Sequence, residues 1–232
     1  MYRVLVDQLQ RTRQPPIDRL WFANLDEYLG FDPKHPCSFA VMLRETFLDE
    51  PKPSPEHVRL LNGMAHDPSA ECGSHEQWVR LHGGPGLAVL GIGVNGHIAF
   101  NEPGTSFDQR THVARLTEST RARAQQDCAD SLIPGQGITM GIGTILDAKE
   151  VLLLASGEGK ADVLRQALLG EISIELPASA LQTHQRVTVI ADKEALSCLP
   201  RGALSALQLR RKGASVRSEY VPAPGSNGSI VS

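Results

Sequence analysis

The sequence lacks the features that mark membrane, secreted and nucleic-acid-binding proteins. No apolar run in its 232 residues approaches the roughly 20 that a helix needs to cross a bilayer. Its first residues contain no uninterrupted apolar segment typical of a secretory signal. Positive charge is not in excess, because 23 basic side chains are set against 26 acidic ones, so nothing favours binding to nucleic acid or to an anionic membrane. We therefore expect a soluble, cytoplasmic protein without either partner.

Cysteine is scarce and scattered. The chain has four, which form no Cys-x-x-Cys pair and no Cys/His pair: Cys37, Cys72, Cys128 and Cys198. A zinc site is therefore not expected. We predict that all four are ordinary reduced thiols and that the chain has no disulfide framework.

What remains is the composition of a globular protein, with 41% apolar and 21% charged residues. A chain of this length can bury a sizeable core in one large domain. We predict such a domain over residues 1–199. The rest, 200–232, is rich in glycine, serine and proline, and we expect it to be a disordered tail apart from one short helix over 203–211.

Short apolar segments alternate with amphipathic ones along most of the chain, which favours an α/β fold. The predicted strands are 20–23, 87–90, 138–141, 151–155 and 187–191, and the predicted helices are 2–13, 37–48, 70–81 and 158–169. The continuous apolar run 87–90 is typical of a strand buried on both faces of a parallel sheet. We therefore predict a three-layer architecture, in which a mostly parallel, Rossmann-like sheet has helices on both faces.

The densest group of special residues directly follows the apolar segment 87–90. It reads Gly-Ile-Gly-Val-Asn-Gly-His-Ile-Ala-Phe-Asn-Glu-Pro-Gly over residues 91–104. Ligands of open parallel sheets bind beyond the carboxyl ends of the strands. Glycine has no β-carbon, so it allows tight turns and lets the backbone approach a ligand closely. We therefore predict a binding loop here, in which the glycines that contact the ligand are Gly91, Gly93 and Gly96.

His97 and Glu102 give this loop its chemistry. Asn95-Gly96 is a turn dipeptide that brings His97 to the mouth of the sheet. An imidazole can both accept and donate a proton near neutral pH, and Glu102 can orient the ring or stabilise its charge. The alternative is a glycine-rich turn whose histidine only caps a backbone carbonyl. A histidine, an asparagine and a glutamate in one loop at a strand end favour the catalytic interpretation.

Two further polar segments also follow predicted strands. The acids Asp26 and Glu27 come directly after the strand at 20–23. Adjacent side chains point in different directions, so only one of the two acids is expected to face a pocket shared with His97. If that acid is Asp26, it could be a general base; a pair of capping or surface acids is the alternative. Lys160, beside glycines at the start of a predicted helix, can anchor an anionic group or can be a solvated lysine in a turn.

These segments resemble the glucosamine-6-phosphate deaminase (isomerase) family. The resemblance is carried by residues 24–30, 91–104 and 157–160, and also by Gly-Ile-Gly-Thr-Ile-Leu-Asp-Ala at 141–148 and Leu-Pro-Ala-Ser-Ala-Leu-Gln at 176–182. It runs from the first residues to about Glu194. The related 6-phosphogluconolactonases share the Gly-His pair but lack the Phe-Asn-Glu-Pro that follows it here.

The resemblance implies a 2-amino-2-deoxyhexose 6-phosphate as substrate. His97 would open the pyranose ring, and Asn95 and Glu102 would hold and polarise its imidazole. Asp26 would then remove the proton from C2 and return it to C1. Ammonia is lost to water, and a ketose phosphate remains.

The remaining implied contacts are with the substrate itself. Glu27 and the loop glycines would bind the sugar, and Lys160 would bind its phosphate. The resemblance implies neither a metal ion nor an organic cofactor, since an open-chain aldehyde already acidifies the C2 proton. It implies no partner beyond the small molecule and is compatible with a homo-oligomer.

The family pattern also has parts that this chain does not match. Members begin with a strand and a glycine- and threonine-rich loop that wraps the phosphate, whereas this chain begins at the helix after that loop. Lys160 is therefore expected to carry the phosphate almost alone, with Arg121 or Arg123 as substitutes for the family's arginine. Two alternatives stay open: galactosamine 6-phosphate as the substrate, and a truncated, non-catalytic protein that binds sugar phosphates. Phe-Asn-Glu-Pro at 100–103 disfavours a lactone hydrolase.

Overall fold

The computed structural model describes residues 17–50, 52–128, 132–200 and 202. Its strands are β1 (Phe22–Ala23), β2 (Asp26–Tyr28), β3 (Val58–Arg59), β4 (Leu87–Gly91), β5 (His112–Arg115), β6 (Gln136–Thr139), β7 (Glu150–Ala155) and β8 (Val187–Ala191). Its α-helices are α2 (Phe39–Leu43), α3 (Pro68–Leu81), α4 (Glu118–Asp127), α5 (Ile142–Leu146) and α6 (Ala161–Leu169). Shorter helical segments are η1 (Ile17–Arg19), the π-helical η2 (Arg44–Leu48), η3 (Pro55–His57), η4 (Glu158–Lys160) and η5 (Pro177–Thr183).

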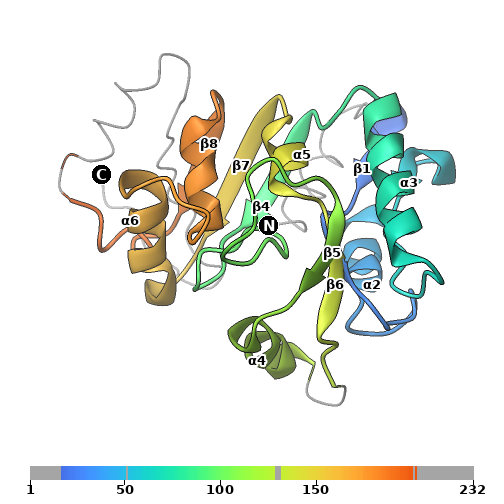
Figure 1. Cartoon of the computed structure of the whole chain (residues 1–232). Helices are drawn as coiled ribbons and strands as arrows, with labels where there is room; N and C mark the ends of the chain where they lie inside the picture. Colours follow the sequence, from blue (N-terminus) through green and yellow to red (C-terminus); the bar gives the residue numbers. More distant parts are fainter. Residues whose placement is uncertain (1–16, 51, 129–131, 201, 203–232) are drawn as a thin grey trace, which may run out of the picture.

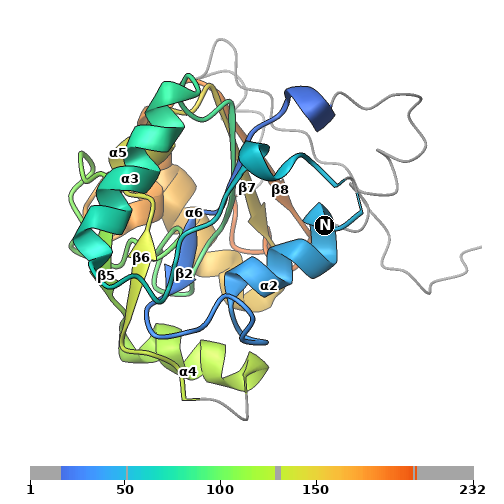
Figure 2. The same cartoon turned by 90° about the vertical axis from the view of Figure 1, so that its right-hand side faces the viewer.

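The predicted α/β architecture is confirmed. β4, β7 and β8 form a parallel sheet in that order, and β1 pairs with β3, also in parallel. Helix α6 lies on one side of the sheet β4-β7-β8, and α3 lies on the other side of the molecule (Figure 1). Figure 2 shows α4 at the lower end of the molecule, below the strands. The fold is therefore the layered, mostly parallel one that the sequence pattern indicates.

One part of the fold departs from this pattern. The strand predicted at 138–141 is β6, which begins two residues earlier and pairs antiparallel with both β2 and β5. Neither β2 nor β5 was predicted, because β2 consists of two acids and a tyrosine and β5 has no apolar run. The order β2-β6-β5 places Asp26 and His112 on opposite sides of the same residue, Thr139.

Local signals explain where the predicted helices begin and end. Asp67 caps α3 by accepting hydrogen bonds from the amides of Ser69 and Ala70, and Pro68 occupies the first helical position, where no amide donor is needed. At the other end of the chain, η4 and α6 together span the predicted helix 158–169, which ends at Gly170 as expected. The capping residues therefore fix these bounds to within a few residues.

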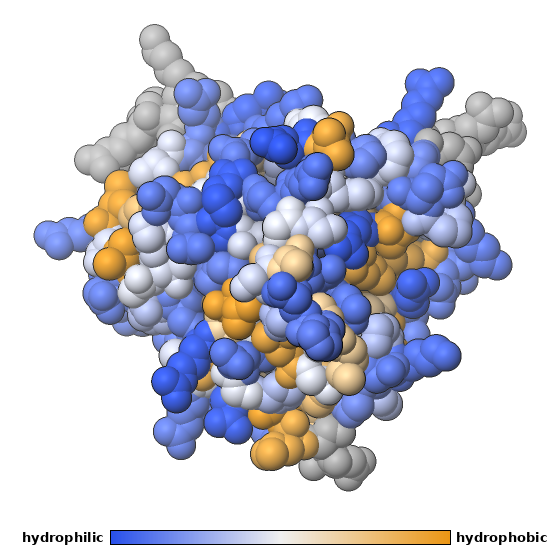
Figure 3. Space-filling model, turned by 45° about the vertical axis from the view of Figure 1, so that its right-hand side comes forward, coloured by the Kyte–Doolittle hydropathy of each residue, from blue (hydrophilic) through white to orange (hydrophobic). Residues whose placement is uncertain are grey.

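The largest hydrophobic core surrounds the parallel sheet. Leu90 of β4, Leu153 of β7 and Leu164 of α6 are almost completely buried there. Burial of β4 on both faces was expected but is wrong at its start, where Leu87 is 55% exposed. Burial alternates along the strand, because successive side chains point to opposite faces of the sheet. Elsewhere, the surface in Figure 3 is mostly hydrophilic, with separate apolar patches.

The prediction of four reduced thiols is wrong for two of them. Cys37 and Cys128 form a disulfide, with their α-carbons 6.0 Å apart and their positions separated by 91 in the sequence. The fold brings the segment before α2 against the C-terminal end of α4, a proximity that spacing along the chain does not reveal. Cys72, buried in α3, and the exposed Cys198 are free thiols, as predicted.

Some expectations fall on parts of the chain that the structure does not describe. The helices predicted at 2–13 and 203–211, and nearly all of the tail 200–232, lie outside the described residues. Within the described ranges, no helix is long and apolar enough to cross a membrane. The same ranges contain no group of three or more histidine, cysteine, aspartate or glutamate side chains that could hold a metal ion.

Candidate active site

The loop after β4 is closed by its own backbone. The amide of Gly93 donates to the carbonyl of His97 at 2.9 Å, and the amide of Gly96 donates to the carbonyl of Gly93 at 3.0 Å. Gly96 has φ +85°, a conformation that side chains rarely adopt. The amides of Gly93 and Gly96 are thus used inside the loop rather than offered to a ligand, whereas Gly91 is exposed at the end of β4.

Gly93 has a specific steric reason to be glycine. A β-carbon there would overlap three ring atoms of His97. The backbone of Gly93 therefore lies directly against the imidazole and forms one wall for it. Gly96 is constrained in a similar way, because an added β-carbon would overlap the side chain of Leu176. Gly93 and Gly96, which were predicted to contact substrate, are therefore needed to shape the loop around His97.

The structure brings Asn95, His97 and Glu102 together, as the sequence pattern predicts. The Asn95 amide donates to Glu102 Oε2 at 2.7 Å, and Asn95 Oδ1 accepts from the backbone amide of His97 at 3.2 Å. His97 Nδ1 lies 3.5 Å from Glu102 Oε2, with 21% of its side chain exposed against 8% for Glu102. A partly exposed imidazole therefore rests on a buried carboxylate, an arrangement that can transfer protons.

The first turn of α4 supplies further donors to Glu102, and sequence reasoning missed them. Thr120 donates its hydroxyl to Glu102 Oε1 at 2.6 Å, and the amide of Thr117 donates to the same oxygen at 3.3 Å. Thr117 is the N-cap of α4 and accepts from the amide of Thr120. A Thr-x-x-Thr spacing before a helical segment is the signal that could have located this turn.

These contacts determine the charge of Glu102. Burial alone would raise the pKa of its carboxyl group, but hydrogen bonds from His97, Thr120 and Asn95, with the attraction of His97, outweigh it and lower the pKa to about 2. Glu102 lies at the N-terminus of α4, where the helix dipole also favours a negative charge. Glu102 is therefore ionised at neutral pH and acts as a fixed acceptor.

Asp26 occupies β2 and has the opposite environment. Desolvation by burial, together with repulsion from Glu27, raises its pKa from 3.8 to about 7. Asp26 pairs in register with Thr139 of β6, and the Thr139 hydroxyl accepts from the amide of Phe100 at 3.1 Å. Asp26 is thus connected through Thr139 to the loop that carries His97. A carboxylate whose pKa lies near neutrality can accept a proton and return it.

Glu27 was expected to bind substrate, and its position does not fit that role. Its side chain is only 1% exposed. One carboxylate oxygen accepts from the Ser38 hydroxyl at 2.6 Å and the Ala40 amide at 2.9 Å, and the other accepts from the amides of Tyr28 and Phe39. Through these bonds Glu27 holds the N-terminus of α2. Successive strand residues point to opposite faces, so Glu27 points away from the face on which Asp26 lies.

Lys160 lies beside the residue that follows β4. Its Nζ donates to the carbonyl of Ile92 at 2.6 Å. Desolvation, followed by repulsion from Arg123, lowers the pKa of Lys160. Arg123 itself donates to Gln126 and Asp127 of its own helix. Arg121 instead donates to the carbonyl of Ile133.

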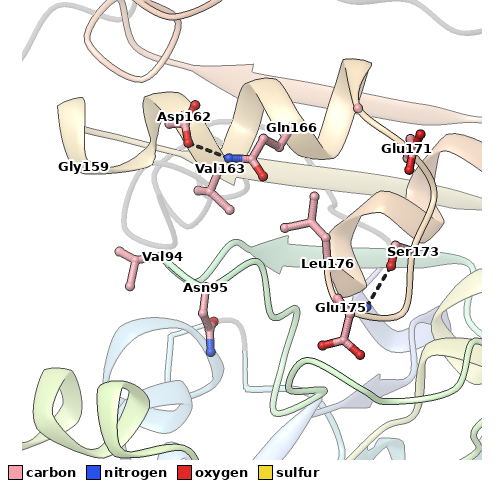
Figure 4. A pocket seen from close by; sticks show the side chains of 11 residues that line it. Val94, Asn95, Gly159, Asp162, Val163, Gln166, Glu171, Ser173, Glu175 and Leu176 are labelled. Atoms are coloured by element: carbon pink, nitrogen blue, oxygen red, sulfur yellow. Dashed lines mark hydrogen bonds between the residues drawn. The ribbon is translucent and has the colours of Figure 1, made fainter.

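A cavity of about 600 Å³ adjoins this loop. Val94 and Asn95 line it from the loop, residues of α6 line it from a second side, and the segment 170–176 completes it (Figure 4). Three acids are among its lining residues: Asp162, Glu171 and Glu175. Asn95 therefore lies between this cavity and Glu102, to which its amide is bound.

Comparison with known proteins decides the family. The model of the family described as glucosamine-6-phosphate isomerases/6-phosphogluconolactonase matches residues 1–190. The chain belongs to this family.

Members of the glucosamine-6-phosphate isomerase/6-phosphogluconolactonase family include close relatives of the chain. A glucosamine-6-phosphate deaminase of Halalkalibacterium halodurans is 45% identical over 199 residues, which are 84% of this chain and 80% of that protein. Glucosamine-6-phosphate deaminase 1 of Bacillus subtilis is 44% identical over 200 residues, 86% of this chain and 82% of that protein.

Solved structures agree with this placement. A structure described as a monomeric glucosamine-6-phosphate deaminase has a TM-score of 0.81 and 43% identity, and the match covers 85% of this chain and 82% of that one. The 6-phosphogluconolactonase of Thermotoga maritima has a TM-score of 0.63 at 18% identity, covering 82% of this chain and 79% of that one. The second likeness concerns the fold alone.

Proposed function

We propose that this chain deaminates and isomerises glucosamine 6-phosphate, giving fructose 6-phosphate and ammonia. Relatives that are 44% and 45% identical to it over the aligned residues are named glucosamine-6-phosphate deaminases. The observation that carries the proposal is the contact of His97 with Glu102 and Asn95 at the end of β4. This arrangement supplies the proton shuttle that opening of a sugar ring requires.

Ring opening is the first step. His97 takes the proton from the anomeric hydroxyl and delivers it to the ring oxygen as the bond between C1 and that oxygen breaks. The ionised Glu102 stabilises the imidazolium that forms between the two transfers. Asn95 fixes Glu102 and His97 relative to each other, because its side-chain amide donates to Glu102 and accepts from the backbone amide of His97.

Proton transfer between carbons is the second step. In the open-chain aldehyde, the C2 proton is acidified by the neighbouring carbonyl. Asp26 removes it and returns it to C1, while a proton passes from the nitrogen to the carbonyl oxygen, so that C1 becomes an alcohol and C2 becomes doubly bonded to nitrogen. Water adds to C2, ammonia leaves, and the ketose phosphate is the product. A carboxyl group with a pKa near 7 suits this step, because it can both hold and release the proton.

The phosphate is assigned to Lys160 and Arg123. Their mutual repulsion, which contributes to the lowered pKa of Lys160, would be relieved by a dianion between them. The loop glycines Gly91, Gly93 and Gly96 would set the shape of the sugar site. All residues named here come from one chain, and the relative with 43% identity is described as monomeric, so we propose that one chain forms a complete site.

The test is incubation of the full chain with glucosamine 6-phosphate, with ammonia and fructose 6-phosphate measured separately. Equal amounts of both products are expected. Galactosamine 6-phosphate and 6-phosphogluconolactone are run in parallel, and faster turnover of either would replace the proposed substrate. Binding of glucosamine 6-phosphate in a calorimeter without release of ammonia would instead support the non-catalytic alternative.

A further inference from the structure

Thr120 is buried at the centre of the site, and the steps above give it no part. It lies in the first turn of α4 and is 8% exposed. Its hydroxyl oxygen is 2.6 Å from Glu102 Oε1 and 3.2 Å from His97 Nδ1. Thr120 therefore touches both members of the pair that opens the ring.

The direction of its hydrogen bonds follows from counting protons. A hydroxyl has one proton to donate and two lone pairs to accept with. An ionised carboxylate can only accept, so the proton of Thr120 goes to Glu102, and the short distance of 2.6 Å fits a charge-assisted bond. The Thr120 oxygen then has lone pairs for its two other neighbours, Thr117 Oγ1 at 3.0 Å and His97 Nδ1 at 3.2 Å. Towards the imidazole it is an acceptor.

The second neighbour of His97 Nδ1 imposes the same direction. Glu102 Oε2 lies 3.5 Å from this nitrogen and is likewise an acceptor. Both oxygens that face Nδ1 therefore require a proton on it. A neutral imidazole has one proton, so its other nitrogen, Nε2, is left with a free lone pair.

We propose that Thr120 is a positioning residue that holds His97 as the Nδ1–H tautomer, so that Nε2 is the nitrogen that receives the proton of the sugar. The tautomer assignment concerns the resting protein and stands on its contacts alone. Its consequence for catalysis rests on the proposed function.

The first test is nuclear magnetic resonance of the full chain with ring-labelled histidine. The chain has eight histidines, and the ring signals of His97 are assigned by their loss in His97→Gln. Two-bond couplings distinguish a protonated from an unprotonated ring nitrogen. Wild type is expected to show Nδ1 protonated and Nε2 unprotonated at a pH where the ring is neutral. An Nε2–H ring in wild type overturns the proposal.

The second test compares two variants of Thr120. Thr120→Val keeps the shape but removes the hydroxyl, so the Nε2–H tautomer should become populated and kcat should fall about tenfold or more, with little change in KM. Thr120→Ser restores the hydroxyl and should return both the ring signals and most of kcat. Equal losses in both variants, or wild-type ring signals in Thr120→Val, would contradict the role.

Thr144→Val is the matched control. Like Thr120, Thr144 is buried and donates its hydroxyl to a carboxylate, Glu76 Oε2, at 2.9 Å. Its replacement should lower the melting temperature but leave the His97 ring signals and kcat unchanged. If wild type has the Nδ1–H ring but releases no ammonia, the tautomer assignment holds and the proposed reaction fails, so the two results can be told apart.

Discussion

The surroundings of Asp26 and Glu102 show how one fold gives two carboxyl groups opposite properties. Glu102 receives hydrogen bonds from Asn95 and Thr120 and lies beside His97, and its pKa falls to about 2. Asp26 is desolvated and lies next to a second acid, and its pKa rises to about 7. The number of donors, rather than burial, distinguishes the two, because burial acts on both in the same direction.

This difference matches the roles proposed for the two residues. A group that only orients and stabilises an imidazole should keep its charge at every working pH. A group that takes and returns a proton should have a pKa near the pH at which the enzyme works. The disulfide between Cys37 and Cys128 connects the two regions. Cys37 precedes α2, whose N-terminus Glu27 holds, and Cys128 ends α4, whose first turn donates hydrogen bonds to Glu102.

Removal of the base should have the largest effect. Asp26→Asn keeps the size of the side chain but cannot take a proton, so kcat should fall roughly 100- to 10,000-fold. Ammonia release under saturating substrate measures it. Asp32→Asn, at an exposed aspartate, is the control and should behave as wild type. A loss of less than about tenfold in Asp26→Asn would assign proton abstraction to another group.

Breaking the connection between the regions should mainly affect stability. A disulfide that closes a loop of this size lowers the entropy of the unfolded chain, so Cys37→Ser should reduce the free energy of unfolding by about 4 kcal/mol in the oxidised protein. Urea denaturation measures the change. Cys198→Ser, at an exposed free thiol, is the control. Titration of the unfolded, unreduced wild type should find two thiols, and four would show that the bond is absent.

Neutralising Glu102 should have a smaller effect on turnover than removing the base. In Glu102→Gln, one of the two oxygens becomes an amide nitrogen that faces donors, so kcat should fall about 10- to 100-fold. Steady-state kinetics measures it, alongside Glu76→Gln as a matched control. Glu76 is a carboxylate held by Arg110 and Thr111, and its pKa is also lowered. Equal losses in both variants would point to general destabilisation.

The pH dependence of stability should show the contrast directly. The fold disfavours the charged form of Asp26, so stability should fall as the pH rises from 3.8, where the unfolded carboxyl group ionises, and should level off near about 7. Glu102 contributes stability above its unfolded pKa, and this should be lost as the pH falls from about 4.5 towards 2. Urea denaturation of wild type and Asp26→Asn between pH 5 and 9 measures the first change. Parallel curves would contradict the raised pKa.

Catalysis offers a second view of the same group. If deprotonated Asp26 is the base, kcat/KM should rise with pH and level off above about 7. Glu102→Gln should show the same rise of kcat/KM with pH, because the rise reflects ionisation of Asp26. If the rise of kcat/KM with pH disappeared in Glu102→Gln, it would be assigned to the loop that carries His97 instead.

The sequence predicts the parts of this fold that depend on neighbouring residues. The apolar runs of β4, β7 and β8 and the cap of α3 are local signals, and the structure confirms them. Pairing of β2, β6 and β5 and the bond between Cys37 and Cys128 depend on residues far apart in sequence. Strand periodicity shows that Asp26 and Glu27 face opposite ways, but not which of them turns to α2.

The candidate site divides in the same manner. The motif from Gly91 to Gly104 predicts the contact among Asn95, His97 and Glu102, because these residues share one loop. Thr120 reaches the loop from another element and is an ordinary threonine in the sequence, so only its position at the start of α4 reveals it. Contacts between elements therefore need the three-dimensional structure.

The wall that Gly93 forms against the imidazole limits how this enzyme could be redesigned. A library that varies every position around the loop would recover only glycine at 93, although no part of that residue needs to reach the sugar, since even a methyl group would displace the ring. Val94, which is 56% exposed and borders the neighbouring cavity, has no such constraint. New substrate preferences are therefore more readily sought one residue further along the chain.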